Sequence, residues 1–408
     1  MSRLPFLLAL ALVTAGAPVS AAHAAPPANR LVNGGFEEPL PGHSWMPAGW
    51  DTSRAGVPTV FFGRDTLMAH GGEFSVSVAN VSTLYPMAHN WSQRLLVGRN
   101  EWGKDLVFRI WTRTNSLDGR GYVLLQAYRD TVSHFAVTQH LDRDEALTRL
   151  GMKRMDDPLV SLGWERETFL EPETGWVKRE LRIYCPPLTN VVFVRAGLQG
   201  TGQILIDDAS LTVETARPAR EPRAGENLLQ DPGFEEGATA WEFSMPPFDG
   251  MRVEVDSTQS HGGKASIMAS SGGALMVRAR TGVCQVIGNR ALAGKRIRLT
   301  GWVKTDSLKS IAYALLYAHT PRGVVQESQP QQFSNDTPWT QTSLEMDVPP
   351  DASIVWAWFC HDAPRPGVVH WDDCKVEVLG KAKTAGNAPR VSEAFLNLPA
   401  SNESKTKP

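Results

Sequence analysis

The chain has 408 residues, a formal net charge of −2 and 13 tryptophans. Because acidic and basic side chains are interspersed and nearly balanced, the sequence offers no positive field for nucleic acid or anionic lipid. Its length suits two domains of ordinary size, each with a hydrophobic core of its own.

The first 24 residues have the composition of a secretory signal peptide. Arg3 supplies a positive charge, residues 4–13 are mostly apolar, and Ala22-His23-Ala24 is a small-x-small cleavage site. The apolar run is too short to span a bilayer, and no later stretch of about 20 apolar residues follows it. We therefore expect cleavage near Ala24–Ala25, no membrane insertion, and a protein that is secreted, periplasmic or held in the cell envelope.

Most of the remaining sequence is one pattern that occurs twice. The opening block at 31–38 returns at 228–236, the His-Gly-Gly block at 70–76 returns at 261–267, and the closing Ile-Asp-Asp at 206–208 returns as Trp-Asp-Asp at 371–373. A repeat this long indicates two copies of a whole domain rather than the short unit of a solenoid. We predict a first domain at 29–213, a linker rich in Pro, Ala and charge at 214–225, a second domain at 226–379 and a disordered polar tail at 380–408.

Within each copy the hydrophobic pattern has a period of two. Short β-branched or aromatic runs, such as 122–128 and 191–198, are bounded by Gly, Pro, Asn and Asp. Many such runs in one domain predict an all-β sandwich. After Tyr128 the spacing between matched residues falls from 191 to 163 positions, so the first copy carries 28 extra residues. We place this insertion at about 129–170 and expect a short helix at 143–150.

Alignment of the two copies separates a core face of the strands from an aromatic and polar face. Trp111 and its counterpart Trp302 alternate with core residues and have cationic or polar neighbours on their own face, which is unusual for a core tryptophan. The same alternation in two further strands of each copy extends the set. The candidate ligand-binding residues are Trp111, Arg113, Tyr122, Gln126, Tyr128, Trp302, Tyr313, Tyr317, His319, Trp356 and Trp358.

Aromatic planes with polar neighbours suit a sugar, whose apolar ring face stacks on them while its hydroxyls accept or donate hydrogen bonds. We therefore expect this face to bind a polysaccharide or glycan. The alternative is that it packs beneath a loop or against the other domain. The second copy is the better candidate, because Arg195 of the first copy stands where the second has Trp358.

Taken together, the opening block with its tryptophan, the His-Gly-Gly block and the closing Asp-Asp block resemble a known family. They are similar to the galactose-binding-domain-like jelly-roll carbohydrate-binding modules that are appended to bacterial cellulases and xylanases. The resemblance covers both copies and implies two tandem β-sandwiches, non-catalytic polysaccharide binding and a secreted glycoside hydrolase as a possible partner. It also implies one structural Ca²⁺ per domain, with Glu37 and Asp207 as ligands in the first and Glu235 and Asp372 in the second. The His-Gly-Gly loops would add carbonyl oxygens; alternatively, these acids cap turns or face solvent.

Two other functions remain open at this point. The non-duplicated region could make the first domain a glycoside hydrolase or lyase, or an accessory subunit of one, although no nucleophile-elbow, zinc-protease or phosphate-loop motif is present in the sequence. The aromatic faces could instead serve adhesion in the cell envelope. Four cysteines form no disulfide framework, but export would permit a Cys360–Cys374 bridge if the two lie on adjacent strands of one hairpin.

Overall fold

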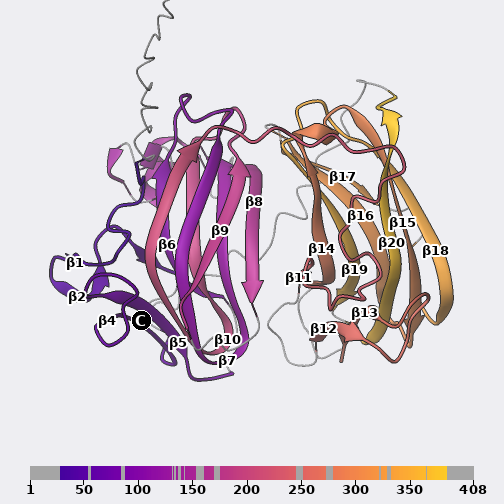
Figure 1. Ribbon diagram of the computed structural model, residues 1–408, viewed down its shortest axis with the longest axis horizontal. Coiled ribbons are helices and arrows are strands. Elements are labelled where there is room, and N and C mark those ends of the chain that lie inside the picture. The colour runs from indigo at the N-terminus through magenta and orange to yellow at the C-terminus, as the bar shows by residue number, and fades with distance from the viewer. Residues whose placement is uncertain are drawn as a thin grey trace, which may run out of the picture.

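Two all-β domains lie side by side in the computed structural model, the first containing β1–β10 and the second β11–β20 (Figure 1). The model describes residues 28–383 except for 54–56, 84–87, 131, 133–134, 137–138, 142, 153–159, 170–174, 245–250, 273–278, 321–322, 329–331 and 364. The signal peptide expected at 1–24 and nearly all of the expected tail lie outside the described residues.

The first domain is built from short peripheral strands around two long ones. Its strands are β1 (Pro39–Leu40), β2 (His43–Pro47), β3 (Asp51–Thr52), β4 (Val60–Asp65), β5 (Ser75–Asn80), β6 (His89–Leu96), β7 (Asp105–Arg129), β8 (Val160–Phe169), β9 (Val177–Tyr184) and β10 (Val191–Glu214). The beginning of β7 pairs with β9 and the end of β10, whereas the end of β7 pairs with β8 and the beginning of β10. Both long strands therefore run through the two layers of one sandwich.

The change of layer falls at residues with a left-handed backbone. Ser116 and Gly119 of β7 have φ of 48° and 131°, and Gly200 and Gly202 of β10 have φ of 97° and 110°. Glycine suits such positions because it has no Cβ to clash with the backbone. One layer has the order β3-β6-β10-β7-β8 and the other the order β4-β5-β10-β7-β9.

The second domain has the same two layers, but each long strand is divided in two. Its strands are β11 (Glu242–Ser244), β12 (Met251–Asp256), β13 (Ser266–Ser271), β14 (Ala279–Asn289), β15 (Lys295–Asp306), β16 (Ile311–Thr320), β17 (Gly323–Ser328), β18 (Thr337–Asp347), β19 (Ile354–Ala363) and β20 (Gly367–Lys381), with a 3₁₀ turn at Arg290–Leu292. The layers are β11-β14-β19-β16-β17 and β12-β13-β20-β15-β18. The chain is therefore two tandem β-sandwiches of jelly-roll type, as predicted.

The insertion of the first domain stands where the second domain has a connection of two residues. Thirty residues separate β7 from β8, whereas only two separate β16 from β17. Within the described part of the insertion, α2 (Arg143–Arg149) agrees with the predicted helix, and Val132, Ala136, Ala146 and Leu147 form a small buried cluster. Because β8 is a strand of the sandwich, the insertion ends before Val160 and is shorter at this end than the predicted 129–170.

Each domain has one core between its layers, and the repeated opening block anchors it. Phe36 and Phe234 are fully buried beside Trp50 and Trp241, with ring centroids 4.8 and 5.0 Å apart. Burial of such side chains contributes about 1.5–3 kcal/mol each. The repeated tryptophan that follows the opening block is therefore a core residue in both copies.

The Cys360–Cys374 bridge is not formed in the structure. β19 and β20 follow each other in sequence but belong to different layers. Cys360 lies on the side of its sheet that faces away from the domain core, whereas Cys374 lies in the core. All four cysteines are buried, and none of them is in a disulfide. No described helix is long and apolar enough to cross a membrane.

Candidate functional site

The predicted ligand-binding residues do not share one face, because their strands belong to different layers. Trp111, Arg113 and Trp302 lie on the layers that contain β9 and β18, which we call the outer sheets. The remaining candidates lie on the layers that contain β8 and β17, which we call the inner sheets. These inner-sheet residues are Tyr122, Gln126, Tyr128, Tyr313, Tyr317, His319, Trp356 and Trp358. Alternation identified the side opposite the core, but not the sheet.

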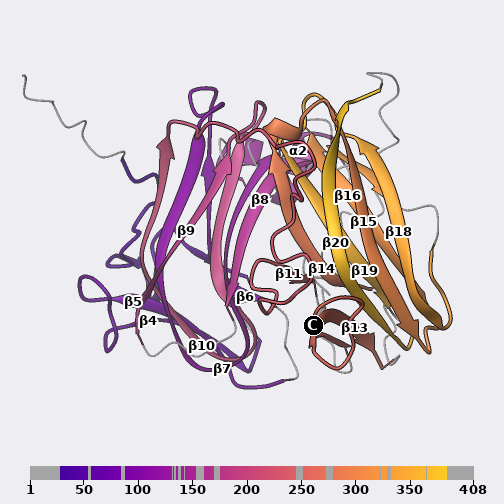
Figure 2. The ribbon, with the colours of Figure 1, turned by 45° about the vertical axis from the view of Figure 1, so that its right-hand side comes forward.

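The inner sheets of the two domains face each other and are buried there. Views from two directions show β8 on the side of the first domain nearest the second (Figures 1 and 2). A hydrophobic cluster spans the boundary, which we call the interdomain cluster: Tyr122, Leu124, Trp164, Cys284, Tyr313, Leu315, Trp356, Trp358 and Cys360. Trp356, Trp358 and His319 are only 0, 5 and 3% exposed. The prediction of an open aromatic face is thus wrong for the inner sheets, because each domain covers the inner sheet of the other.

β8 makes the central contacts of this boundary. Trp164 stacks on Trp356 with ring centroids 4.2 Å apart and an angle of 25° between the planes. His319 donates through Nδ1 to the carbonyl oxygen of Ser161 at 2.9 Å, and the Ser353 hydroxyl donates to the carbonyl of Leu162. A bulge between Ala127 and Tyr128 in the pairing of β7 with β8 brings these two carbonyls into reach.

In the first domain, the inner-sheet polar candidates already have partners. Gln126 accepts a hydrogen bond from Arg195, and Asn90 donates to the Tyr122 hydroxyl at 2.8 Å. Tyr128 meets Phe193 edge to face at 5.8 Å, and burial raises the pKa of its hydroxyl. The sheet therefore presents a satisfied polar network rather than free donors.

Titratable groups at the boundary are shifted toward their neutral forms. Burial lowers the pKa of His319 to about 4. It raises the pKa of Glu165 to about 7 and that of Glu242 to about 8. A low-dielectric contact disfavours charge, so these directions are those of a dehydrated interface.

The outer sheets carry a different aromatic arrangement, which recurs in both domains. In the first, His70 stacks on Trp111 with centroids 3.9 Å apart, and Trp176 meets the same imidazole edge-on at 5.8 Å. The Nδ1 atom of His70 lies 2.6 Å from a carboxylate oxygen of Asp208. We call these four residues the first platform.

The second platform has the same geometry. His261 stacks on Trp302 at 3.8 Å, Trp339 meets it edge-on at 5.8 Å, and Asp373 lies 2.6 Å from Nδ1. Both platforms are partly open: the histidine side chains are 27 and 28% exposed, and the aspartates 42 and 45%. All four tryptophans are half-buried. The sequence analysis included Trp111 and Trp302 but missed the other members, although all of them lie in matched blocks.

Hydrogen-bonding side chains border each platform. Lys178 is the cross-strand partner of Trp111, and Arg113 lies two residues further along the same face. Gln341 is the partner of Trp302, and Lys304 lies two residues further along. Rings with donors beside them are thus present on both outer sheets.

The four predicted calcium ligands lie beneath the platforms, against the His-Gly-Gly loops. Asp207 accepts from the backbone amides of His70 and Gly71 at 2.7 and 3.1 Å, and Glu37 from those of Glu73 and Phe74 at 3.0 and 3.2 Å. The loop therefore points backbone amide groups at these acids, where the resemblance had implied carbonyl oxygens.

The second domain repeats this contact closely. Asp372 accepts from His261 and Gly262 at 2.7 and 3.1 Å, and Glu235 from Lys264 and Ala265 at 2.8 and 3.2 Å. In each domain one acid comes from the opening block and the other from the last strand. Their contacts therefore tie both ends of the domain to one loop.

A bulge in the last strand explains why two adjacent aspartates serve different partners. Asp208 and Asp373 have φ of 46° and 45°, and the pairing register of each last strand shifts at this point. The bulge lets Asp207 and Asp372 turn toward the loop backbone while the next residue meets the histidine. Asp208 and Asp373 therefore hold the platform histidines.

Whether these acids suit a hard cation depends on how many of them converge and on which of their oxygens already accept hydrogen bonds. The described residues contain no group of three or more His, Cys, Asp or Glu side chains placed to hold a metal ion. However, Asp207 and Asp372 are fully buried, and burial raises the pKa of each. Both oxygens of Asp207 and of Asp372 accept from backbone amides. Glu37 and Glu235 accept through Oε1 alone, so Oε2 of each glutamate remains for an oxygen-preferring ion.

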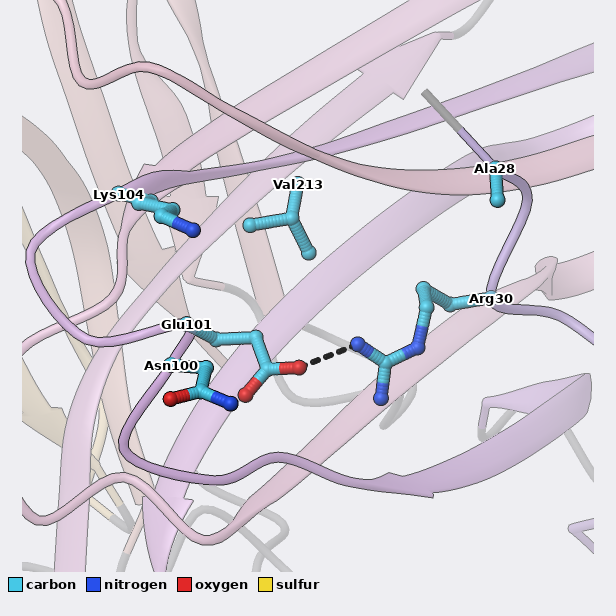
Figure 3. A pocket seen from close by; sticks show the side chains of 6 residues that line it. All are labelled: Ala28, Arg30, Asn100, Glu101, Lys104 and Val213. Atoms are coloured by element: carbon cyan, nitrogen blue, oxygen red, sulfur yellow. Dashed lines mark hydrogen bonds and ion pairs between the residues drawn. The ribbon is translucent and has the colours of Figure 1, made fainter.

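One surface hollow of about 310 Å³ lies near the start of the first domain (Figure 3). It is lined by Ala28, Arg30, Asn100, Glu101, Lys104 and Val213. The ion pair between Arg30 and Glu101 occupies its middle. Since no aromatic side chain lines it, the hollow is not a stacking site for a sugar.

Comparisons with known proteins give structural neighbours only. No family model and no curated protein matches the chain. The N-terminal CBM22-1–CBM22-2 tandem domain of Xyn10C from Paenibacillus barcinonensis is similar at 14% identity and a TM-score of 0.30, covering 88% of this chain and 100% of that one. A family 16 carbohydrate-binding module (18%, TM-score 0.29) covers 37% of this chain and 99% of its own. A CBM61 module in complex with β-1,4-galactotriose (15%, TM-score 0.28) covers 38% and 99%.

These neighbours are of the class that the repeated blocks resemble. Because the identities and TM-scores are low, the fold assignment rests on the strand order of the chain itself.

Proposed function

We propose that this protein is a non-catalytic polysaccharide-binding protein that contacts its ligand through the two outer-sheet platforms. The observation that carries the proposal is the recurrence, in both domains, of a partly exposed His–Trp–Trp–Asp arrangement bordered by hydrogen-bonding side chains. The free surfaces of Trp176 and Trp339 provide the stacking planes. Asp208 and Asp373 accept from hydroxyls, and Arg113, Lys178, Lys304 and Gln341 donate to them.

Two platforms on one chain favour a polymeric ligand. A polymer that engages one platform brings its next segments to the other at a high effective concentration, which multiplies two weak affinities by about 10²–10⁴. Modest stacking at each platform then suffices for retention on an insoluble polysaccharide.

The proposal also specifies where the protein acts and which kind of enzyme acts beside it. The signal-peptide composition of residues 1–24 supports export to the cell surface, periplasm or medium, where polysaccharide is available. A secreted glycoside hydrolase is the natural partner, since a binding protein keeps substrate near such an enzyme. The hydrolase or lyase alternative has little support, because β8 belongs to the common fold and the described insertion is a short helix with a small cluster of its own.

We further propose that each domain binds one Ca²⁺, through Glu37 and Asp207 in the first and Glu235 and Asp372 in the second. The ion would neutralise a buried carboxylate and stabilise the connection between the opening block, the last strand and the loop. Because the same loop carries the platform histidine, calcium would also keep each platform in shape.

Retention on a panel of insoluble xylan, galactan and cellulose tests the binding proposal. Trp176→Ala and Trp339→Ala each remove one stacking plane and leave the His–Trp stack beneath it. We expect each to weaken retention about tenfold, which is about 1.4 kcal/mol, and the double variant to lose avidity and retention altogether.

Trp45→Ala is the matched control, because Trp45 is 40% exposed, lies on β2 and belongs to neither platform. It should be retained like the parent chain. Unchanged retention of the double variant, or failure of the parent chain to bind any polysaccharide in a wider panel, would overturn the proposal. Release of reducing sugar or unsaturated uronate would instead support the enzyme alternative.

A further inference from the structure

The inner sheet of the second domain combines stacked rings with unsatisfied polar atoms. Tyr317 lies nearly parallel to Trp356 and Trp358, at 22° and 30°, with centroids 6.2 and 5.8 Å apart. The buried atoms Trp356 Nε1 and His319 Nε2 have no hydrogen-bond partner among the described residues. Leaving such buried atoms unpaired costs free energy, so an optimised permanent interface would pair them.

The occupant of this surface in the closed chain is the first domain. The Trp164 ring stacks on Trp356 at 4.2 Å, and the carbonyl oxygens of Ser161 and Leu162, just before Gly163, accept from His319 and Ser353. Gly163 faces Ile354, and a Cβ added to it would be in van der Waals contact with Ile354 Cγ2 at 3.7 Å. A flat ring with acceptor oxygens beside it presents what a sugar ring with its hydroxyls presents.

A sugar would satisfy this surface better than β8 does. With Nδ1 of the neutral His319 as donor, Nε2 is an acceptor, and the Trp356 indole is a donor. A hydroxyl group both donates and accepts, so it can pair with either atom. The backbone carbonyls of β8 offer only acceptors, and therefore leave His319 Nε2 unpaired.

The connection between the domains allows them to separate. The linker at 214–225 is irregular from residue 215, and a chain of this length can extend by about 35–40 Å. Several of its side-chain contacts are exposed ion pairs, such as Lys295 with Glu221, which contribute little. Arg217 adds two hydrogen bonds, to the carboxylate of Asp105 through its backbone amide and from the Arg290 guanidinium to its carbonyl. The closed state therefore depends on the contacts of the sheets and not on the linker.

We propose that the inner sheet of the second domain is a latent carbohydrate-binding surface that Trp164 of the first domain closes by occupying the position of a sugar ring. Polysaccharide binds there only when the domains separate, so closure weakens binding in proportion to the stability of the closed state. This surface is distinct from the platforms, and the inference does not depend on them.

The test uses the full chain with both platforms removed by Trp176→Ala and Trp339→Ala. In this background, Trp164→Glu should separate the domains, because it replaces the stacked ring with a charge that cannot be buried without a partner. We expect a larger radius of gyration by small-angle X-ray scattering and at least a tenfold gain in retention on xylan, galactan or cellulose. Further substitution of Trp356→Ala should abolish the gained retention.

Leu188→Glu is the control, since Leu188 is 43% exposed and outside the interdomain cluster. It should change neither the radius of gyration nor retention. A Trp164→Glu chain that stays closed would show that Trp164 does not hold the surface shut. An opened chain that gains no retention on any of the three polysaccharides would show that the surface is a structural interface only. If the background chain still binds as the parent does, the platform proposal fails, while the gain caused by Trp164→Glu remains a measurable test.

Discussion

The second domain has two aromatic surfaces with similar sequence patterns and different surroundings. Trp356 and Trp358 on the inner sheet are almost completely buried against the first domain, whereas Trp302 and Trp339 on the outer sheet are half-buried beside an exposed aspartate. On the inner surface, burial lowers the pKa of His319 and favours its neutral form, whereas charged side chains border the outer surface. An aromatic residue that points away from its own core is therefore not necessarily in contact with solvent.

The comparison also shows what a duplicated feature means. Corresponding distances in the platforms and in the carboxylate contacts beneath them are nearly equal in the two domains, but the interdomain cluster joins unlike partners. Only the first domain supplies the stacking ring of Trp164, because the strand pairing places Gln326 at the equivalent position of the second domain. The platforms and their carboxylate contacts occur twice and are formed within each domain, whereas the interdomain cluster occurs once and holds the two domains together.

Removal of one ring from each surface gives the largest expected contrast. Trp356→Ala should lower the free energy of unfolding by about 3–5 kcal/mol, because it leaves a cavity in a buried contact. Trp339→Ala should cost only about 1 kcal/mol, since its ring is partly exposed. Denaturant unfolding of both variants measures the difference, and equal losses would show that the two surfaces are buried alike.

Removal of calcium should affect the outer surface. An ion present at 100 times its Kd stabilises a domain by about 2.7 kcal/mol, so EDTA should lower Tm by about 5–10 °C. An Asp207→Asn, Asp372→Asn variant should no longer respond to EDTA. A parent chain whose Tm is unmoved by EDTA would contradict the calcium proposal.

A change of pH should give the smallest effect, and on the inner surface. The pKa of His319 is lowered to about 4 in the closed chain and returns to about 6.5 when the residue is exposed. The exposed state thus binds the proton more readily, and stability falls as the pH drops from 6.5 toward 4. At pH 5.5 the loss is about 1 kcal/mol relative to neutral pH.

Glu165 and Glu242 act in the opposite direction, since their raised pKa values make the folded state the better proton acceptor as the pH falls below about 8. The measurement is therefore the difference between the parent chain and His319→Gln, which has no titrating imidazole at this position. If both chains have the same pH dependence of unfolding between pH 7.5 and 5.5, His319 is not buried in an interface.

Much of the fold could be read from the sequence, because the repeat provided an internal alignment. It located the two sandwiches, the core alternation, the helix at 143–149 and the carboxylates that converge on the His-Gly-Gly loops. The site was less predictable. Alternation specifies which side of a strand faces away from its core, but β15 and β16 lie in different layers, and sequence spacing does not reveal that.

Two further features depend on contacts between distant residues. Nothing in the residues around Trp164 indicates that its ring stacks on Trp356, almost 200 positions away, in another domain. The role of Asp208 depends on a bulge that overrides strand alternation. The recurrence of Trp176 as Trp339 was the available signal for the platforms, since both stand in matched blocks next to strands of the same sheet.

Hydroxyl-radical footprinting of the full chain, free and in the presence of polysaccharide, tests most directly whether the two aromatic surfaces differ. In the free chain, Trp176 and Trp339 should be oxidised, while Trp356 and Trp358 should react at the rate of the core residues Trp50 and Trp241. A bound polysaccharide should protect Trp176 and Trp339 and leave Trp356 and Trp358 unreactive. Oxidation of Trp356 and Trp358 in the free chain at the rate of the platform tryptophans, or no protection of the platforms by a retained polysaccharide, would contradict the account.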